Sequence, residues 1–548
     1  MTHSNSMPPG LYLGIDVGST TVKVVITDGA GRLLDYDYRY GRGQPARALL
    51  DAWRDLARRR DLTRVAAVGL TGSGGELLAP LLGARRVNEL VAQTHALQIH
   101  VPQARTVIEM GGQDSKLLRL EPDGDRLRLA DFAMNDLCAA GTGSFLEQQA
   151  ERLGLSLAEF SALALQARKP ARVAGRCAVF AKSDLVHLQQ QGLPLPDLVA
   201  GLCLAVARNL RATLGGGRPF QPPIVFQGGV ARNAGMVWAF EQVLKLEPDA
   251  LLVPPHCTLM AALGAAYVAR VEPAPSFRGL EPLAEFAAAR RVRPSSLPQL
   301  PRRPARAAAP LPPAPNPSLC SARTTVRAPA SDCSPDPARE GEAVWLGIDV
   351  GSVSTKAAAV DGEGRLLAGC YLSTAGQPLA VARQARDRVL AQVGDSVPVL
   401  GLGVTGSGRH LVGKRLAADL VCNEISAQAR AARAWDPQAD TVFEIGGQDS
   451  KYIALREGAI ADQVLNKACA AGTGAFLEEQ AGRLNLPVEE MGRLALTAAA
   501  PADLGERCTV FMESDLVHHQ QQGVALPDLA AGLSYAVARN YLTRVVHN

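Results

Sequence analysis

The sequence predicts a duplicated α/β protein, and three observations support this prediction. β-rich apolar runs such as 11–17 alternate with segments of helical spacing such as 46–60. Glycine-rich turns follow several of the apolar runs. LGIDVGSTTVK at 13–23 returns as LGIDVGSVSTK at 346–356, and later motifs return in the same order. Alternating strands and helices with hairpins between them are typical of α/β layers, so we expect two copies of one α/β domain.

The expected elements of the first copy follow from periodicity. Two alternating, β-branched runs joined by a Gly-Ser-Thr turn predict a β-hairpin at 11–28. Helical spacing at 46–60 predicts a helix, and 65–74 reads as a short buried strand that runs into a glycine turn. Residues 106–120 predict a strand, a glycine turn and a second strand. Two helices are then expected at 144–155 and 157–165.

The domain boundaries are set by the repeats and by one change in composition. We expect an N-terminal tail at 1–10, a first domain at 11–270, a linker at 271–343 and a second domain at 344–548. The linker holds 15 of the 36 prolines with many Ala and Arg, which predicts an extended, solvated segment. The second domain ends at Asn548 without a counterpart of QGGVARN. It is therefore expected to be incomplete, with nucleotide binding there in doubt.

Composition excludes several classes of protein. The 548 residues are 47% hydrophobic and 20% charged, which is incompatible with a wholly disordered chain. A net charge of +4 gives no reason to expect a nucleic-acid or membrane-surface binder. No apolar run approaches the length of a transmembrane helix, and the N-terminus shows no secretory signal. We therefore expect a cytoplasmic protein without nucleic-acid or membrane partners.

Three glycine turns in the first copy are candidate phosphate-binding loops. Tight turns expose backbone N–H groups that can hold phosphate oxygens, and a nearby carboxylate can hold hydrated Mg²⁺. Lys23, which closes the second strand, is as compatible with phosphate contact as with a solvent-facing position. The candidate residues of the three turns are Asp16, Gly18, Ser19, Thr20, Thr21 and Lys23, then Gly111, Gly112, Gln113 and Asp114, and finally Gly228, Gly229 and Asn233.

The second copy repeats the first two of these turns. Asn88-Glu89 also recurs, as Asn423-Glu424, and the sequence assigns this pair no role. The candidate residues in the second copy are Asp349, Gly351, Ser352, Ser354 and Lys356, then Gly446, Gly447, Gln448 and Asp449.

Four cysteines recur in matching contexts. Cys138 and Cys177 lie 39 residues apart, as do Cys469 and Cys508, and each precedes a helix-forming run. Helix N-termini favour thiolates and other anions, so these positions suit ligands of an anionic iron–sulfur cluster. A four-iron cluster needs four ligands, and two copies supply four. The cysteines could instead be buried apolar side chains or bind zinc, although close C-x₂-C pairs are absent.

The combined motifs resemble those of one family. The order of the glycine turns resembles the actin-like (ribonuclease H-like) ATPase fold of actin, sugar kinases and Hsp70. EMGGQDSK at 109–116, CAAGTGSFLE at 138–147 and RCAVFAKSDLVHLQQQG at 176–192, each repeated in the second copy, resemble the activator ATPases of 2-hydroxyacyl-CoA dehydratases. These are related to the ATP-binding subunits of benzoyl-CoA reductase (BadF/BadG/BcrA/BcrD-type ATPases).

This resemblance implies a function. The cysteine positions that match the family's 4Fe-4S ligands are Cys138, Cys177, Cys469 and Cys508. ATP and Mg²⁺ would bind at the glycine turns, with Asp16, Asp114, Asp349 and Asp449 as the catalytic carboxylates. Ferredoxin or flavodoxin would supply a low-potential electron, and ATP hydrolysis would drive its transfer to an acyl-CoA dehydratase or reductase-like partner. Because the copies are fused, we expect an intrachain pseudo-dimer or, alternatively, a homodimer.

Three other functions remain open from the sequence. A sugar or acid kinase of the same fold would use the turns but would leave the cysteine pairs unexplained. A non-catalytic nucleotide-binding scaffold and a zinc-bridged structural dimer are the other two.

Overall fold

The computed structural model describes residues 10–124, 126–135, 142–174, 181, 184–185, 187–189, 191–248, 250–288, 296–300, 343–394, 397–466, 472–506 and 509–546. Among these residues, no helix combines the length and the apolar character that a membrane span requires.

The first lobe of the first copy is a five-stranded sheet with the order β3-β2-β1-β4-β5. β1 pairs antiparallel with β2 and parallel with β4, so the expected hairpin forms the centre of the sheet. The alternating apolar residues of β1 and β2 are fully buried beneath α1, for example Leu13 and Val24. The elements are β1 (Leu11–Val17), β2 (Thr21–Thr27), β3 (Leu33–Tyr40), α1 (Pro45–Arg59), β4 (Val65–Thr71), α2 (Gly75–Leu82) and β5 (Arg85–Arg86).

The second lobe is a five-stranded sheet with the order β10-β9-β6-β7-β8. Its helices pack an apolar core that includes the edge-to-face pair Phe226 and Phe240. The elements are β6 (Thr106–Met110), β7 (Ser115–Asp123), β8 (Arg126–Asn135), α4 (Gly143–Arg152), α5 (Leu157–Ala164), α7 (Leu195–Thr213), β9 (Ile224–Gln227), η3 (Gly229–Arg232), α8 (Ala234–Leu244) and β10 (Leu251–Leu252).

Two helices join the lobes, α3 (Glu89–His100) and α9 (Met260–Val271). Both contribute to one apolar cluster with β2 of the first lobe and β6 and β7 of the second. α9 lies so close to β1 that a Cβ on Gly14 would be 1.8 Å from the carbonyl oxygen of Ala262. Glycine is therefore required at position 14 for the close approach of helix and strand.

The segment expected to be an extended linker is partly folded. α10 (Glu281–Ala288) is a short helix whose Leu283 is fully buried, and the ring of Phe277 stacks on Trp53 at 4.9 Å. The prediction of a solvated chain throughout 271–343 is therefore wrong for this part, because a few apolar residues within the proline-rich composition are enough to attach it to the first lobe. Residues 301–342, which carry PRRPARAAAPLPPAPNP, lie outside the described residues.

The second copy repeats the first lobe with the strand order β13-β12-β11-β14-β15, followed by a β16-β17-β18 sheet. Its Asp349 pairs in register with Lys356, as Asp16 pairs with Lys23. The elements are β11 (Val344–Val350), β12 (Ser354–Val360), β13 (Leu366–Ser373), α11 (Pro378–Val393), β14 (Val399–Thr405), α12 (Arg409–Leu416), β15 (Leu420–Val421), α13 (Glu424–Trp435), β16 (Thr441–Ile445), β17 (Ser450–Arg456), β18 (Ala459–Leu465), α14 (Gly474–Arg483), α15 (Val488–Ala495), α16 (Thr509–Gln521), α17 (Leu526–Tyr541) and η6 (Leu542–Val546).

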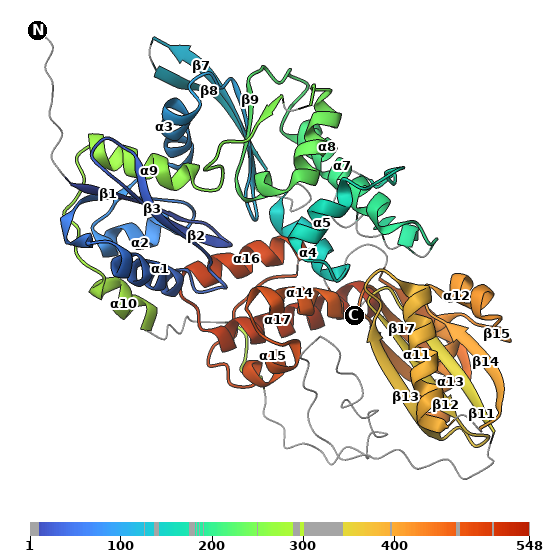
Figure 1. Cartoon of the computed structure of the whole chain (residues 1–548). Coiled ribbons are helices and arrows are strands. Elements are labelled where there is room, and N and C mark those ends of the chain that lie inside the picture. The colour runs from blue at the N-terminus through green and yellow to red at the C-terminus, as the bar shows by residue number, and fades with distance from the viewer. Residues whose placement is uncertain are drawn as a thin grey trace, which may run out of the picture.

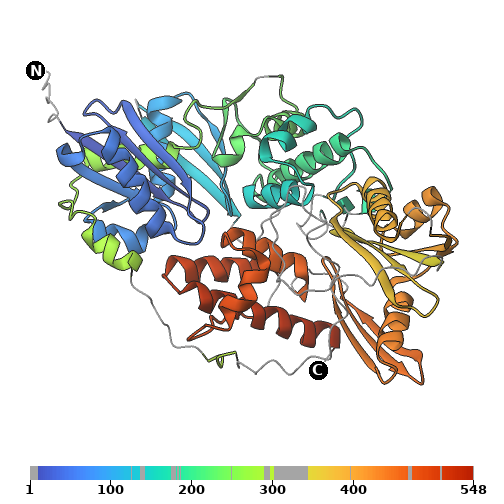
Figure 2. The same cartoon turned by 60° about the horizontal axis from the view of Figure 1, so that its bottom comes forward.

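The two copies contact each other reciprocally. A Cβ on Gly43 of the first copy would lie 2.6 Å from the side-chain nitrogen of Gln520, and a Cβ on Gly376 of the second copy would lie 2.6 Å from that of Gln189. Gly43 and Gly376 occupy matching positions in the repeat, as do Gln189 and Gln520. Figures 1 and 2 show the helices α14 to α17 (red) between the first copy and the sheets of the second. The copies therefore face each other with approximate twofold symmetry.

Candidate functional site

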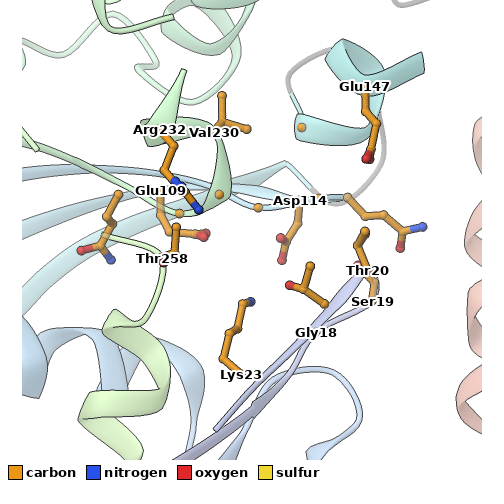
Figure 3. Close-up of a pocket in the computed structure, with 18 of the residues that line it drawn as sticks. Gly18, Ser19, Thr20, Lys23, Glu109, Asp114, Glu147, Val230, Arg232 and Thr258 are labelled. Carbon is orange, nitrogen blue, oxygen red and sulfur yellow. The ribbon is translucent and has the colours of Figure 1, made fainter. Parts of the chain in front are cut away.

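A cleft of about 920 Å³ opens between the lobes of the first copy. It contains residues from all three glycine turns that the sequence analysis singled out. In Figure 3, Lys23, Asp114 and Glu109 point into the same space, and Arg232 approaches it from the side of the third turn. The expected residues that line the cleft are Asp16, Gly18, Ser19, Thr20, Thr21, Lys23, Gly111, Gly112, Gln113, Asp114, Gly228, Gly229 and Asn233.

The first turn joins β1 to β2 in the hairpin. The backbone N–H of Gly18 donates to the carbonyl of Thr21 at 3.0 Å, which closes the turn. Asp16 and Lys23 face each other across the hairpin, with Lys23 Nζ 2.7 Å from Asp16 Oδ2. Burial lowers the pKa of Lys23, but the charge and hydrogen bond of Asp16, together with Tyr38 and Glu109, outweigh it, so the pKa is raised. Lys23 is therefore a charged group aimed into the cleft and does not face solvent.

The second turn joins β6 to β7 and meets the first turn directly. The N–H of Gly111 donates to the carbonyl of Asp114 at 3.0 Å. A Cβ on Gly112 would lie 2.3 Å from Oγ1 of Thr20, so only glycine allows the two turns to approach this closely. Two tight turns from different lobes thus form one continuous rim, which is suited to a chain of phosphates.

The third turn follows β9 and requires glycine at its first position. Gly228 has φ +92°, and a Cβ there would lie 2.2 Å from the carbonyl oxygen of Met110. Asn233 lines the cleft, and its side chain also caps α8 by accepting from the N–H of Met236 at 3.1 Å. The six residues from Gly228 to Asn233 therefore place backbone against the cleft and lead directly into α8.

A lysine within a ring of carboxylates lies beneath the second turn. Lys116 Nζ lies 2.9 Å from Glu89, 3.2 Å from Glu109 and 2.6 Å from Asp114, and the side chain is almost fully buried. Burial lowers the pKa of Lys116, but the three carboxylates raise it well above its ordinary value. Burial also raises the pKa of Glu109 to about 7, although the attraction of Lys116 opposes this shift. The cluster holds Asp114 in place at the rim of the cleft.

The sequence analysis did not predict this cluster, although a signal was present. Glu109 and Lys116 are the first and last residues of the repeated motif EMGGQDSK. The unassigned pair Asn88-Glu89 now has two roles: Asn88 caps α3 by accepting from the N–H of Leu90 at 2.9 Å, and Glu89 binds Lys116. The second copy repeats both features, since Asn423 caps α13 and Lys451 contacts Glu424, Glu444 and Asp449.

The second copy also keeps the geometry of the first two turns. Lys356 Nζ lies 3.1 Å from Asp349 Oδ2. The N–H groups of Gly351 and Gly446 donate to the carbonyls of Ser354 and Asp449 at 3.0 and 2.9 Å. A Cβ on Gly447 would lie 2.8 Å from Val353, which repeats the contact between the turns of the first copy. Ser352 and Gln448 belong to the same two turns, and this sequence has no counterpart of Gly228, Gly229 and Asn233.

The residues of the first cleft fit a nucleotide with Mg²⁺. Gly112 and Gly228 line the cleft without side chains, and a Cβ at either would collide with a neighbouring turn or strand. Asp16 and Asp114 supply carboxylate oxygens, the ligand type that Mg²⁺ prefers. Gln227 also lines the cleft, and its buried Oε1 has no hydrogen-bond partner within the described part of the chain. Buried polar atoms normally have one, so this atom is suited to a bound ligand.

The four cysteines expected to hold a cluster, Cys138, Cys177, Cys469 and Cys508, lie outside the described residues. Of the cysteines that the structure describes, Cys203 and Cys257 are buried free thiols, and Cys370 is also buried. Burial raises the pKa of Cys203 to about 12, so this thiol is neutral.

One wall of the first cleft comes from the second copy. α16 contributes Ser514, Val517, His518 and Gln521 to its lining. No feature of the sequence predicted this contribution, because periodicity and repeats do not reveal how two copies pack against each other.

The fold and the cleft define a nucleotide-binding protein of the actin-like ATPase fold. The chain belongs to the BadF/BadG/BcrA/BcrD ATPase family. The sequence model of this family matches residues 13–269 and 346–546. It is 36% identical to the activator of lactoyl-CoA dehydratase of Anaerotignum propionicum, over 47% of this chain and 96% of the relative. It is 32% identical to the 2-hydroxyisocaproyl-CoA dehydratase activator of Clostridioides difficile, over 47% of this chain and 94% of the relative.

A solved structure gives a similar match. The activator of the 2-hydroxyisocaproyl-CoA dehydratase from Clostridium difficile with bound ADPNP is 30% identical, over 47% of this chain and 94% of that chain, with a TM-score of 0.43. Each of these relatives thus matches a little under half of the present chain over nearly its own whole length.

Proposed function

We propose that this chain is an ATP-dependent iron–sulfur activator that passes a low-potential electron to a 2-hydroxyacyl-CoA dehydratase or a benzoyl-CoA reductase-like partner. Family membership and the dehydratase activators among its relatives support the ATPase and activator parts of this proposal. The observation that carries it is the reciprocal contact of the copies, Gln520 with Gly43 and Gln189 with Gly376. Two copies that face each other in this way are suited to contribute two cysteines each to one shared site.

Different residues of the first cleft would bind the phosphates, the Mg²⁺ ion and the adenosine of the nucleotide. The turns at Gly18–Thr21 and Gly111–Asp114 would bind the β- and γ-phosphates, and Asp16 and Asp114 would orient Mg²⁺ and the attacking water. Gly228, Gly229 and Asn233 would contact the adenosine side. Lys23 and Lys116 hold these carboxylates in position, since each makes a charged contact with one of them.

The cysteines would hold the electron carrier. An iron–sulfur cluster with four thiolate ligands supplies one-electron transfer at low potential. Cys508 comes one residue before α16, and Cys138 comes five residues before α4, so helix N-termini follow both in the sequence. The positive end of a helix stabilises thiolates and anionic groups. Ferredoxin or flavodoxin would be the electron donor.

The test is an anaerobic activation assay. The reduced, iron-loaded chain is mixed with a purified 2-hydroxyacyl-CoA dehydratase, and dehydratase activity and phosphate release are followed together. We expect activity to depend on the chain, on reductant and on ATP, and to be lost in Asp16→Asn. Transfer of phosphate to a sugar or an organic acid, or ATP hydrolysis by a chain that holds no iron, would contradict the proposal.

A further inference from the structure

The linker between the copies is attached at two places within its described residues. Helix α10 packs on the first lobe, where its Leu283 is fully buried and the preceding Phe277 stacks on Trp53. Residues 296–300, which we call the strap, instead contact α15 and α17 of the second copy. Figures 1 and 2 both show α10 on the side of the first lobe toward the red helices of the second copy. The linker thus joins the two copies through two attached segments.

The second copy holds the strap by one apolar and two polar contacts. Leu300 packs against a cluster of buried alanines. The hydroxyl of Tyr535 donates to the carbonyl of Pro298 at 2.9 Å. Nε2 of Gln299 donates to the carbonyl of Ala499 at 2.8 Å. The residues of the second copy in these contacts, which together form the strap site, are Ala495, Ala498, Ala499, Ala530, Ala531 and Tyr535.

The first copy has the same backbone frame at the matching place. Repeated residues differ here by 331 in number, as do Asp197 and Asp528. Oδ1 of Asp528 accepts from the N–H groups of residues 499 and 500 at 2.8 and 2.9 Å. Oδ1 of Asp197 accepts in the same way from those of residues 168 and 169, both at 2.9 Å. The two copies therefore share this loop and differ at the strap site in side chains.

The side chains of the first copy do not suit the strap. Leu204 stands in place of Tyr535, Val199 in place of Ala530 and Arg172 in place of Asp503. The first difference removes the hydroxyl that donates to Pro298, and the second adds bulk where Leu300 packs. The third places a cation where Ser296 lies 3.5 Å from a carboxylate, beside a linker that is rich in arginine. The strap therefore fits the second copy and not the first.

The connection between the two attached segments is short. Residues 289–295 join α10 to the strap. An extended chain spans at most about 3.6 Å per residue, so the strap reaches at most about 30 Å from the end of α10. A first copy that paired with another first copy would present its strap to the surface with Val199 and Leu204. Only a second copy offers the strap its contacts at that place.

We propose that the strap selects the partner of the first copy, so that the first copy pairs with a second copy and not with another first copy. The reciprocal contacts of Gln520 with Gly43 and of Gln189 with Gly376 do not make this choice, since the same residue types meet in both. The second copy of the same chain is tethered at a high effective concentration, so the choice makes one chain the working unit. The inference goes beyond the proposed function and does not depend on nucleotide or cluster binding.

Cleavage of the full chain between the copies tests this choice. A protease site is inserted between Thr324 and Thr325, beyond the described residues, so that the strap stays on the first-copy fragment. Both fragments are studied together by analytical ultracentrifugation without nucleotide or iron, so that no bound group joins them. We expect complexes of one first-copy and one second-copy fragment. Complexes of two first-copy fragments, formed beside equal amounts of the second-copy fragment, would overturn the inference.

Variants of the strap and of its site provide the second measurement. Leu300→Asp is expected to raise the Kd of the two fragments by about 10- to 100-fold, as for the loss of one leucine from an apolar cluster. Tyr535→Leu with Ala530→Val gives the strap site two residues of the first copy and should raise the Kd by about tenfold. Ser534→Ala is the control, because the hydroxyl of Ser534 donates within its own helix, and should leave the Kd unchanged. The same Kd for wild type and all variants would overturn the role of the strap.

Discussion

Nζ of the buried Lys116 lies 2.6 Å from Oδ2 of Asp114, which belongs to the second glycine turn. Lys451 and Asp449 repeat the pair in the second copy at 3.0 Å. The contact holds the carboxylate of Asp114 in place at the rim of the cleft, because charge-assisted hydrogen bonds fix the geometry of both partners. The second glycine turn is thus attached to a charged cluster beneath it.

Replacement of Lys116 by Ala is expected to destabilise the first copy by about 3–5 kcal/mol, because it leaves the buried carboxylate of Glu109 and two partly buried carboxylates without a cation. Lys169→Ala, at an exposed position, is the matched control and should cost less than about 0.5 kcal/mol. Urea unfolding, monitored by circular dichroism, measures the free energy of unfolding of both variants. A Lys116→Ala protein as stable as wild type would show that the carboxylates do not depend on this lysine.

The raised pKa of Glu109 predicts how the free energy of unfolding depends on pH. Its pKa is raised from 4.5 to about 7 by burial, against the attraction of Lys116. Between these values the folded chain binds more protons than the unfolded chain, so this group stabilises the fold at low pH and its contribution is lost as the pH rises to about 7. Glu109→Gln cannot titrate and should lack this part of the pH dependence.

The measurement is urea unfolding of wild type and Glu109→Gln from about pH 5 to about pH 8, without nucleotide or metal. The difference in free energy of unfolding between the two proteins should change with pH up to about pH 7 and then stay constant. Glu121→Gln, at an exposed position of β7, should follow wild type throughout. If this difference in free energy of unfolding does not depend on pH, Glu109 does not titrate between about pH 5 and about pH 8.

Gly14 and Gly347 occupy matching positions but have different surroundings. A Cβ on Gly14 would lie 1.8 Å from the carbonyl oxygen of Ala262, whereas a Cβ on Gly347 has no described atom within 4 Å. We expect Gly14→Ala to destabilise the first copy by about 3 kcal/mol or more and Gly347→Ala to change stability by less than about 1 kcal/mol. Thermal unfolding of the two variants compares them directly, and equal losses would contradict the close packing of α9 on β1.

Gly228 and Gly229 are neighbours in the third turn with different constraints. Gly228 has φ +92° and its Cβ would collide with the backbone at Met110, whereas the nearest atom to a Cβ on Gly229 is the hydroxyl of Tyr38 at 3.6 Å. Gly228→Ala should therefore lower thermal stability by several degrees, while Gly229→Ala should leave it unchanged. The melting temperatures of the two variants without nucleotide test this difference, and a stable Gly228→Ala protein would mean that the turn tolerates another backbone conformation.

The sequence predicted what is local and missed what depends on packing. The hairpin at Asp16 to Lys23 and the three glycine turns follow from alternation and turn chemistry, and the structure brings all three turns to one cleft. The cluster around Lys116 was missed because Glu89 is distant in sequence and reaches Lys116 only through the packing of α3, while Glu109 faces Lys116 across the β6–β7 hairpin. The crossing of α16 into the first cleft was missed because no periodicity records the contact of Gln521 with Ser73.

The most direct test of the account is a determination of iron and sulfide in the anaerobically purified chain, with electron paramagnetic resonance of the reduced protein with and without ATP. The account predicts about four iron and four sulfide per chain and a spectrum that changes with ATP. It also predicts loss of most of the iron in Cys138→Ser and in Cys508→Ser, which remove one ligand from each copy, and no loss in Cys203→Ser, at a buried free thiol. A colourless chain without iron, or iron that is retained in all three variants, would contradict it.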